Sequence, residues 1–290
     1  MQVALQILFD SLMLIGLYGI GALGFALIWG VLNVLNIAHA AFIMLGGYTS
    51  FWLWRLGFDP LVALPLTMAA MFAVGWLVQR CLIDHVASGP HALGIALTYG
   101  INLVLIGLAL YFFTADYRSI QLPGYLRGFI EIGGAKLTYA RLTITVIALS
   151  LTGAVWWFMD RTELGAAIRA TRFDMEAARL VGIKVRAIYD LTTAISAMLA
   201  GAMGGLIVIL QSASPGMGDH FLLQILIVTV LGGLGSMVGP LVGAVVLGLA
   251  TSFVATIWGT TYGTLVGAFL VLGVLVLKPS GLLGRRYYEV

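Results

Sequence analysis

Long apolar runs, broken by short polar connections, dominate this sequence of 290 residues. A membrane-spanning helix needs about 20 consecutive apolar residues, because it must cross about 30 Å of hydrocarbon. Only 9% of the residues are charged and 61% are hydrophobic, whereas a soluble domain is about one quarter charged. So few charges would not cover the surface of a soluble globule of this size. The sequence therefore predicts an all-α, polytopic membrane protein.

Nine segments are candidate membrane spans, and we expect them to form a single transmembrane domain over residues 1–290. They are 5–29, 34–54, 61–80, 91–113, 142–159, 187–210, 221–235, 239–257 and 262–277. Two of them, 221–235 and 262–277, are short, so eight spans are the main alternative. The first apolar run lacks a basic start and continues past the length of a signal peptide, so we expect a retained span.

Lysine and arginine residues orient the spans, because cytoplasmic connections carry an excess of them. Segment 161–186 holds six of the 15 basic residues. With this segment in the cytoplasm, ten basic residues lie inside and five outside, so we expect a periplasmic N-terminus and a cytoplasmic C-terminus. The inside set adds Arg80, Lys278, Arg285 and Arg286 to the six, and the outside set is Arg55, Arg118, Arg127, Lys136 and Arg141.

Connection 114–141, on the expected outer face, is the longest one there. Pro123, Gly124, Gly133 and Gly134 punctuate it, and such residues favour turns. We expect either a solvated connector or a docking surface for a partner, with room for a short hairpin.

Segment 161–186 has the pattern of a short amphipathic helix. Its apolar residues Leu164, Ile168, Met175 and Ala178 recur at roughly helical spacing, and polar residues fill the positions between them. Gly182 can adopt the left-handed conformation that ends a helix. Such a helix can lie in a groove on a soluble partner. The alternative is an ordinary helix on the membrane surface.

Asn33, Asn36 and His39 form the main polar cluster near the spans. Steps of three residues place them on one broad face if the segment is helical. They either cap the junction of the first two spans or line the substrate path or its gate. No acidic residue falls in the middle of an expected span. Because an ion-coupled carrier commonly uses such a carboxylate, this counts against that class.

No catalytic constellation is present in the sequence. The four histidines and the single cysteine, Cys81, lack the spacing of metal ligands, and there is no phosphate-binding loop. The sequence therefore predicts a chain that is not an enzyme and holds no metal or cofactor. If ATP drives transport, another subunit must hydrolyse it.

Three stretches carry a resemblance to a known family: NVLNIAHAAFIMLGGYTSF, GAAIRATRFDMEAARLVGIKVRAIYDLTTAISAMLAGAMGGL and VLGGLGSMVGPLVGAVVLG. Within the second, EAARLVG matches the E-A-A-x-x-x-G pattern of ABC-importer permeases. The Leu-Pro element that follows this pattern in the best-known branch is not evident. Over nearly its full length the chain resembles the branched-chain amino-acid ABC transporter permeases, the high-affinity leucine, isoleucine and valine importers.

The resemblance implies an ABC-importer permease fold with a cytoplasmic coupling helix, which ATPase closure would push. The implied coupling residues are Leu164, Ile168, Arg172, Glu176, Ala177, Ala178 and Gly182. It also implies a second homologous permease, two cytoplasmic ATPase subunits that bind ATP and Mg²⁺, and a periplasmic substrate-binding protein, all at the bacterial inner membrane.

Branched-chain amino acids are the cargo that the resemblance implies, and urea, short amides or other amino acids are the alternatives. A secondary carrier or channel without an ATPase is a third possibility from a different class. The small net charge of +3 reflects cytoplasmic anchors and not a nucleic-acid partner.

Overall fold

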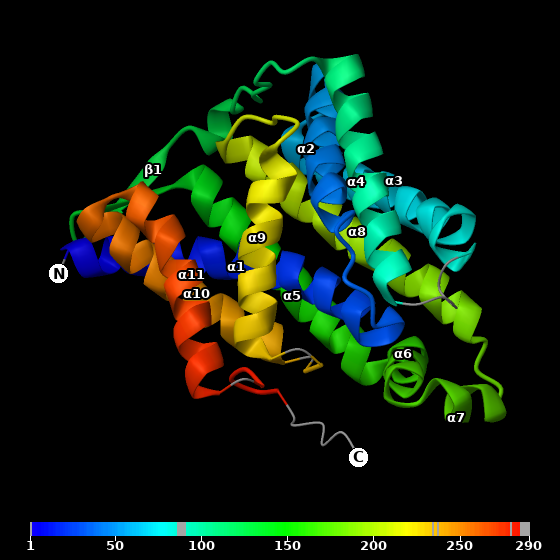
Figure 1. Ribbon diagram of the computed structural model, residues 1–290. Helices are drawn as coiled ribbons and strands as arrows, with labels where there is room; N and C mark the ends of the chain where they lie inside the picture. The colour runs from blue at the N-terminus through cyan, green and yellow to red at the C-terminus, as the bar shows by residue number, and fades with distance from the viewer. Residues whose placement is uncertain (1, 86–90, 234, 237, 279, 285–290) are drawn as a thin grey trace. The chain divides into compact units, whose positions relative to one another are not determined.

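The computed structural model describes residues 2–85, 91–233, 235–236, 238–278 and 280–284. Each of the nine expected spans forms a helix (Figure 1). These helices are α1 (Gln2–Leu32), α2 (His39–Arg55), α3 (Pro60–Cys81), α4 (His91–Phe113), α5 (Tyr139–Arg161), α8 (Val185–Leu210), α9 (Met217–Gly232), α10 (Gly239–Trp258) and α11 (Thr260–Leu277). Arg285 and Arg286, counted above as inside residues, lie outside the described residues.

Seven helices in the described part of the chain are long and apolar enough to cross a membrane. The two others are α2, with 17 residues, and α9, with 16 residues. Helices of this length extend about 24–26 Å, which is less than the hydrocarbon thickness. Segment 262–277 was expected to be short, but α11 meets the length requirement with 18 residues. The expected spans that fall short of the length requirement are therefore α2 and α9.

The chain packs as two compact units. The first unit comprises Met1–Ala26, Gln121–Ser150 and Leu223–Val290, and the second comprises Leu27–Ile120 and Leu151–Leu222. The helices α1, α5 and α9 contribute residues to both units. The single transmembrane domain expected over residues 1–290 stays a prediction.

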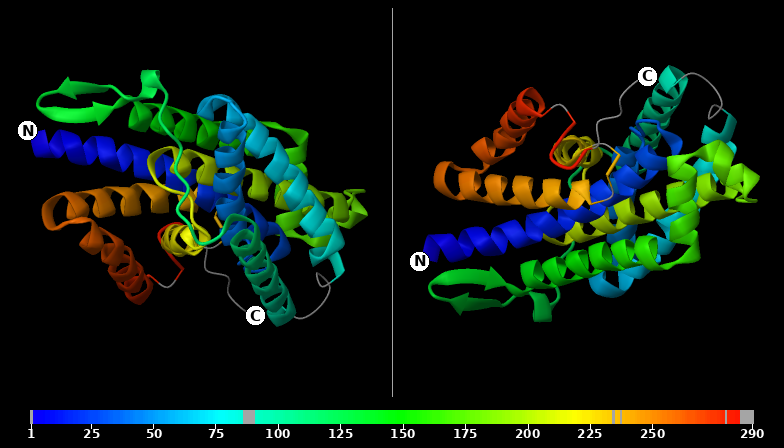
Figure 2. Two further views of the ribbon diagram at one scale, coloured as in Figure 1. Left: turned by 90° about the horizontal axis from the view of Figure 1, so that it is seen from above. Right: turned by 90° about the horizontal axis from the view of Figure 1, so that it is seen from below.

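The first unit contains the expected hairpin in the connection before α5. Strands β1 (Phe129–Ile132) and β2 (Ala135–Thr138) pair antiparallel, after a short helical turn, η2 (Gly124–Leu126). Gly133 and Gly134 have φ angles of +57° and +85°, which suit a two-residue hairpin turn. Figure 2 shows the strands side by side, with β2 leading into α5.

The same unit fastens this hairpin to the start of α1. The Gln2 side-chain amide donates to the Gly134 carbonyl oxygen at 2.7 Å, and the Lys136 backbone N–H donates to Gln6 Oε1 at 3.2 Å. Arg141 in the first turn of α5 forms an ion pair with Asp10 of α1. These contacts fix the hairpin against two spans.

The second unit is built around α8, which packs against α2 and α3 (Figure 1). Glycines line the contact between α2 and α8. A Cβ atom added to Gly204 would lie 1.9 Å from the Ile43 carbonyl oxygen, and one added to Gly46 would lie 2.4 Å from the Gly201 Cα. Small residues allow helix backbones to approach closely within a bilayer. The α2–α8 contact is therefore a backbone-to-backbone seam.

Candidate functional site

Segment 161–186 folds as two short helices, α6 (Glu163–Phe173) and α7 (Met175–Leu180). The expected single amphipathic helix is therefore wrong at Asp174, which has extended backbone angles (φ −153°, ψ 108°). Its carboxylate accepts a hydrogen bond from the Ala177 N–H at 3.0 Å. Aspartate side chains stabilise helix starts better than helix interiors, because they satisfy N–H groups that have no partner within the helix. Asp174 thus ends one helix and caps the next.

The helix end predicted at Gly182 is confirmed. Gly182 has a φ angle of +86°. Its N–H donates to the Arg179 carbonyl oxygen, and the Ile183 N–H donates to the Ala178 carbonyl oxygen, both at 3.0 Å. This pair of bonds is the Schellman motif, which satisfies the last carbonyl groups of a helix. It turns the chain from α7 toward α8 within the four residues that separate the two helices.

The apolar residues that point outward from segment 161–186 differ from those the spacing suggested. Ile168 is 0% exposed and Ala178 is 3% exposed, so both face the chain itself. By contrast, Phe173, Leu180 and Val181 are 86%, 89% and 77% exposed. We call these three residues the exposed apolar triad. Large apolar side chains gathered on a polar segment mark an interaction surface.

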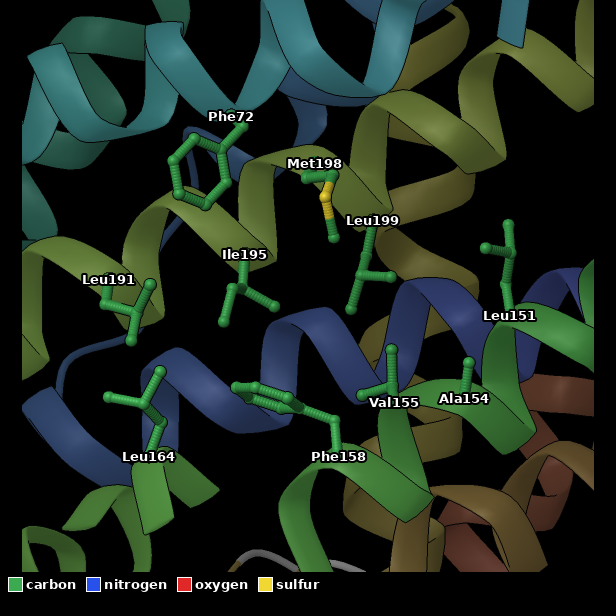
Figure 3. A pocket seen from close by; sticks show the side chains of 10 residues that line it. All are labelled: Phe72, Leu151, Ala154, Val155, Phe158, Leu164, Leu191, Ile195, Met198 and Leu199. Carbon is green, nitrogen blue, oxygen red and sulfur yellow. The ribbon is translucent and has the colours of Figure 1, made fainter. Parts of the chain in front are cut away.

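Leu164 has a different environment from the triad. It lines an apolar groove with a cavity volume of about 360 Å³ in the second unit, together with Phe158 of α5 (Figure 3). Phe72 of α3 and Leu191 and Ile195 of α8 form other parts of the wall. Leu164 therefore joins α6 to the spans, while half of its surface stays exposed.

The remaining predicted coupling residues have different surroundings: Arg172 contacts α1, whereas Glu176 and Ala177 are exposed. Arg172 lies against the end of α1, since a Cβ atom on Gly30 would be 2.8 Å from Arg172 Nε. Glu176 forms an exposed ion pair with Arg179 at 3.0 Å. Ala177 is exposed and supplies the N–H that Asp174 caps.

A chain of polar contacts connects the segment to α8 and α3. Arg186, in the first turn of α8, pairs with Asp84 at 2.5 Å, in the short helix η1 (Ile83–His85). The Gln79 side chain donates to Asp84 at 3.3 Å and accepts from the Thr193 hydroxyl at 2.7 Å. A displacement of α7 would therefore reach two spans through defined bonds.

A sulfur contact adds a second connection between the segment and α8. The Tyr189 hydroxyl of α8 donates to Met175 Sδ of α7 at 2.9 Å. Met175 is half-buried, so this residue, expected to be an outward anchor, links α7 to its own span.

The cluster of Asn33, Asn36 and His39 does not lie on one helix face, contrary to the prediction. Residues 33–38 are not helical, because α1 ends at Leu32 and α2 begins at His39. Asn33 has a φ angle of +51°, a left-handed conformation that asparagine tolerates better than most residues. Asn33 is exposed, whereas Asn36 and His39 are buried. His39 Nδ1 lies 3.3 Å from the Ser196 hydroxyl of α8. Whether these residues touch substrate stays a prediction.

Asp219, an acidic residue outside the expected spans, contacts the middle of one of them. Asn102 lies at the midpoint of α4, and its side-chain amide donates to Asp219 Oδ1 at 3.4 Å. Asp219 was assigned to an outer connection, but it belongs to the first turn of α9. One sequence signal pointed to it: the apolar run 221–235 is too short for a complete span, so its helix could begin below the membrane surface.

Taken together, the described helices define a class, that of polytopic membrane proteins with a helical polar segment joined to the spans. One chain of "PsaBC from Streptococcus pneumoniae in complex with Fab" has a similar fold, with a TM-score of 0.51 over 94% of this chain and 92% of that chain. Its sequence identity is 14%, so this likeness concerns the fold alone. The expected fold class, an all-α polytopic ABC-importer permease, is confirmed.

The family model described as "Branched-chain amino acid transport system / permease component" matches residues 7–277, and the chain belongs to this family. The high-affinity branched-chain amino acid permease protein BraD of Pseudomonas aeruginosa is 28% identical over 301 residues, covering 98% of this chain and 97% of BraD. The corresponding LivH protein of Escherichia coli K12 is 27% identical over 300 residues, with the same coverage. The chain is a multi-pass inner-membrane protein.

Proposed function

We propose that this chain is the membrane-spanning subunit of an ATP-driven importer for branched-chain amino acids. Its family and the names of BraD and LivH support this cargo. In the proposed complex a periplasmic binding protein delivers the solute, and a second, homologous permease completes the path. Two cytoplasmic ATPase subunits bind ATP and Mg²⁺. This chain itself catalyses no reaction.

The exposed apolar triad is the observation that carries the coupling role. Phe173, Leu180 and Val181 lie at the ends of α6 and α7 and would face water without a partner. A groove on one of the ATPase subunits would cover them, as grooves cover the apolar face of a short helix in other complexes. Closure of the ATPase would then displace α7, and the bonds from Arg186 and Tyr189 would pass that displacement to α8 and α3.

Coupling of ATP to transport requires a difference in binding free energy between two states of the permease. ATP shifts the permease between its two states only if the nucleotide-bound ATPase contacts one state more favourably than the other. A segment that is rigidly capped at Asp174 and Gly182 suits this role, because it transmits a displacement instead of absorbing it.

The test uses the complete complex in proteoliposomes. The triple variant Phe173→Ser, Leu180→Ser, Val181→Ser should lower ATP-dependent leucine uptake at least about tenfold, which corresponds to about 1.4 kcal/mol of coupling. It should also release the ATPase subunits during purification. Ala170→Ser, an exposed change on the same segment, is the control and should keep both properties.

Two outcomes would contradict the proposal. Full uptake by the triple variant would show that the ATPase docks elsewhere. Uptake by the purified chain alone, driven by an ion gradient, would favour a secondary carrier. Because Asp219 contacts the middle of α4, the lack of an acidic residue within the expected spans no longer counts against that carrier. Family membership is therefore what favours the importer.

The ligand of the binding protein distinguishes branched-chain amino acids from the second class of cargo. Urea or a short amide remains the alternative solute for the same architecture. A binding protein that binds urea and shows no response to leucine would replace the first choice.

A further inference from the structure

Helix α9 begins inside the second unit and not at the membrane surface. A Cβ atom on Gly218 would lie 2.1 Å from the Ala40 carbonyl oxygen, so the first turn of α9 touches the backbone of α2. The neighbouring residue, Asp219, contacts Asn102 at the midpoint of α4. Because α4 is a candidate span, this contact places the Asp219 carboxylate near the middle of the bilayer. Carboxylates at that depth are costly and usually serve function.

Two acceptor oxygens meet at this point. The Asn102 side chain is 2% exposed, and its Nδ2 atom donates to Asp219 at 3.4 Å. Its Oδ1 atom is buried and has no hydrogen-bond partner among the described residues. Asp219 itself is exposed. An incoming donor therefore finds a charged oxygen that it can reach and an amide oxygen beside it that needs a hydrogen.

A second buried amide belongs to the connection between α1 and α2, which contacts α4. Thr98, one helical turn before Asn102, accepts from the Ile37 N–H at 3.3 Å and donates to the Leu35 carbonyl oxygen at 3.1 Å. Asn36 is the residue between them, and it is 1% exposed. Within the described chain neither side-chain atom of Asn36 has a hydrogen-bond partner. Native proteins satisfy most buried polar groups, so Asn36 and Asn102 both have free hydrogen-bonding capacity for a polar solute.

We infer that Asp219, with Asn102 beside it, binds the protonated amino group of the transported solute during its passage. This inference rests on the proposed function, because an amino acid brings such a group. An ammonium ion has three donors and one positive charge. The carboxylate of Asp219 and the Oδ1 of Asn102 supply a charged and a neutral acceptor, and Asn36 is the third candidate contact. The site would therefore favour solutes with a cationic amine over neutral urea or amides.

A water molecule or a sodium ion could occupy the same oxygens, and the experiment must separate them from the solute. Asp219→Asn keeps the shape of the side chain but removes its charge, and Asp219→Glu keeps the charge. Asp116→Asn is the matched control, because Asp116 is an exposed acid on the connection that follows α4. All three variants are assembled with the complete complex in proteoliposomes.

The measurements are leucine uptake, and ATP hydrolysis stimulated by the leucine-loaded binding protein. Asp219→Asn should lower uptake at least about tenfold, while stimulated ATP hydrolysis stays within about twofold of the unaltered complex. Asp219→Glu should restore at least about one third of the uptake. Asp116→Asn should leave both quantities unchanged. This pattern, with uptake that is independent of sodium and proton gradients, supports the inference.

Other results overturn it. Normal leucine uptake by Asp219→Asn would show that the carboxylate does not meet the solute. An equal loss of uptake and stimulated hydrolysis in Asp219→Asn and Asp219→Glu would assign Asp219 a structural role. Uptake that requires a sodium or proton gradient and loses that requirement in Asp219→Asn would assign the site to the ion. Failure of the unaltered complex to import leucine with ATP would instead contradict the proposed function.

Discussion

The seam between α2 and α8 gives the sharpest prediction for stability, through the variant Gly204→Ala. The added Cβ atom would lie 1.9 Å from the Ile43 carbonyl oxygen. Carbon–oxygen contacts in proteins begin near about 3.3 Å, so the two helices must separate locally by about 1.4 Å. The obstacle is a backbone atom within a helix, which cannot rotate away as a side chain would.

We therefore expect a cost near the upper end for overpacking, about 3 kcal/mol. For a chain of this size that lowers the Tm by roughly 6–12 °C. The assay is thermal unfolding of the detergent-solubilised protein, followed by tryptophan fluorescence. Gly107→Ala on α4 is the control, because no described atom lies within 4 Å of its new Cβ. Alanine should be neutral or stabilising there by up to about 1 kcal/mol. Equal Tm values for the two variants would refute the close approach of α2 and α8.

Three further variants test the polar segment and its connections. Arg186→Ala removes the cation that pairs with Asp84, whose side chain is 7% exposed. The lost interaction is worth about 2 kcal/mol, so the Tm should fall by roughly 4–8 °C. An equally large fall when Arg186→Ala is made in the Asp84→Asn variant would contradict the pairing. Gly182→Ala forces alanine into a left-handed conformation at about 1–2 kcal/mol, so leucine import per ATP hydrolysed should drop, whereas Gly153→Ala should keep the ratio. Asp174→Ala removes the cap of α7 at about 1 kcal/mol, and hydrogen exchange of the α7 amides, measured by mass spectrometry, should accelerate; unchanged exchange would argue against capping.

Much of the fold follows from local sequence, and the helix boundaries show why. Within the described residues, each of the nine apolar runs forms a helix, and seven of these helices are long and apolar enough to cross a membrane. Gly182 was predictable, since glycine at a helix end has a specific conformational advantage. The break at Asp174 was not predicted, because the apolar spacing continues through it. The spacing gave no sign that Asp174 would adopt an extended backbone and cap α7.

The candidate site was less predictable, because depth within the membrane is a property of packing. Asp219 stands beside a glycine in a connection, and nothing local shows that Gly218 seats it against Ala40. Asn36 was identified for its polarity. The sequence did not show that α1 ends at Leu32, which leaves Asn33 exposed and Asn36 buried. Leu164 and Met175 matched the helical spacing, yet both contact the spans of their own chain. Helical spacing shows which residues share a face, but it does not show whether the chain itself or a partner covers that face.

The position of α2 beside α8 also has a consequence for biosynthesis. His39 and the Ser196 hydroxyl it meets are 157 residues apart in the chain. At a synthesis rate of about 5–20 residues per second, α2 waits roughly 8–30 s for that partner to be made. During this interval His39 and the glycines of α2 lack the contacts that α8 makes with them in the folded chain. Until α8 is synthesised, α2 therefore lacks the helix that covers its glycines.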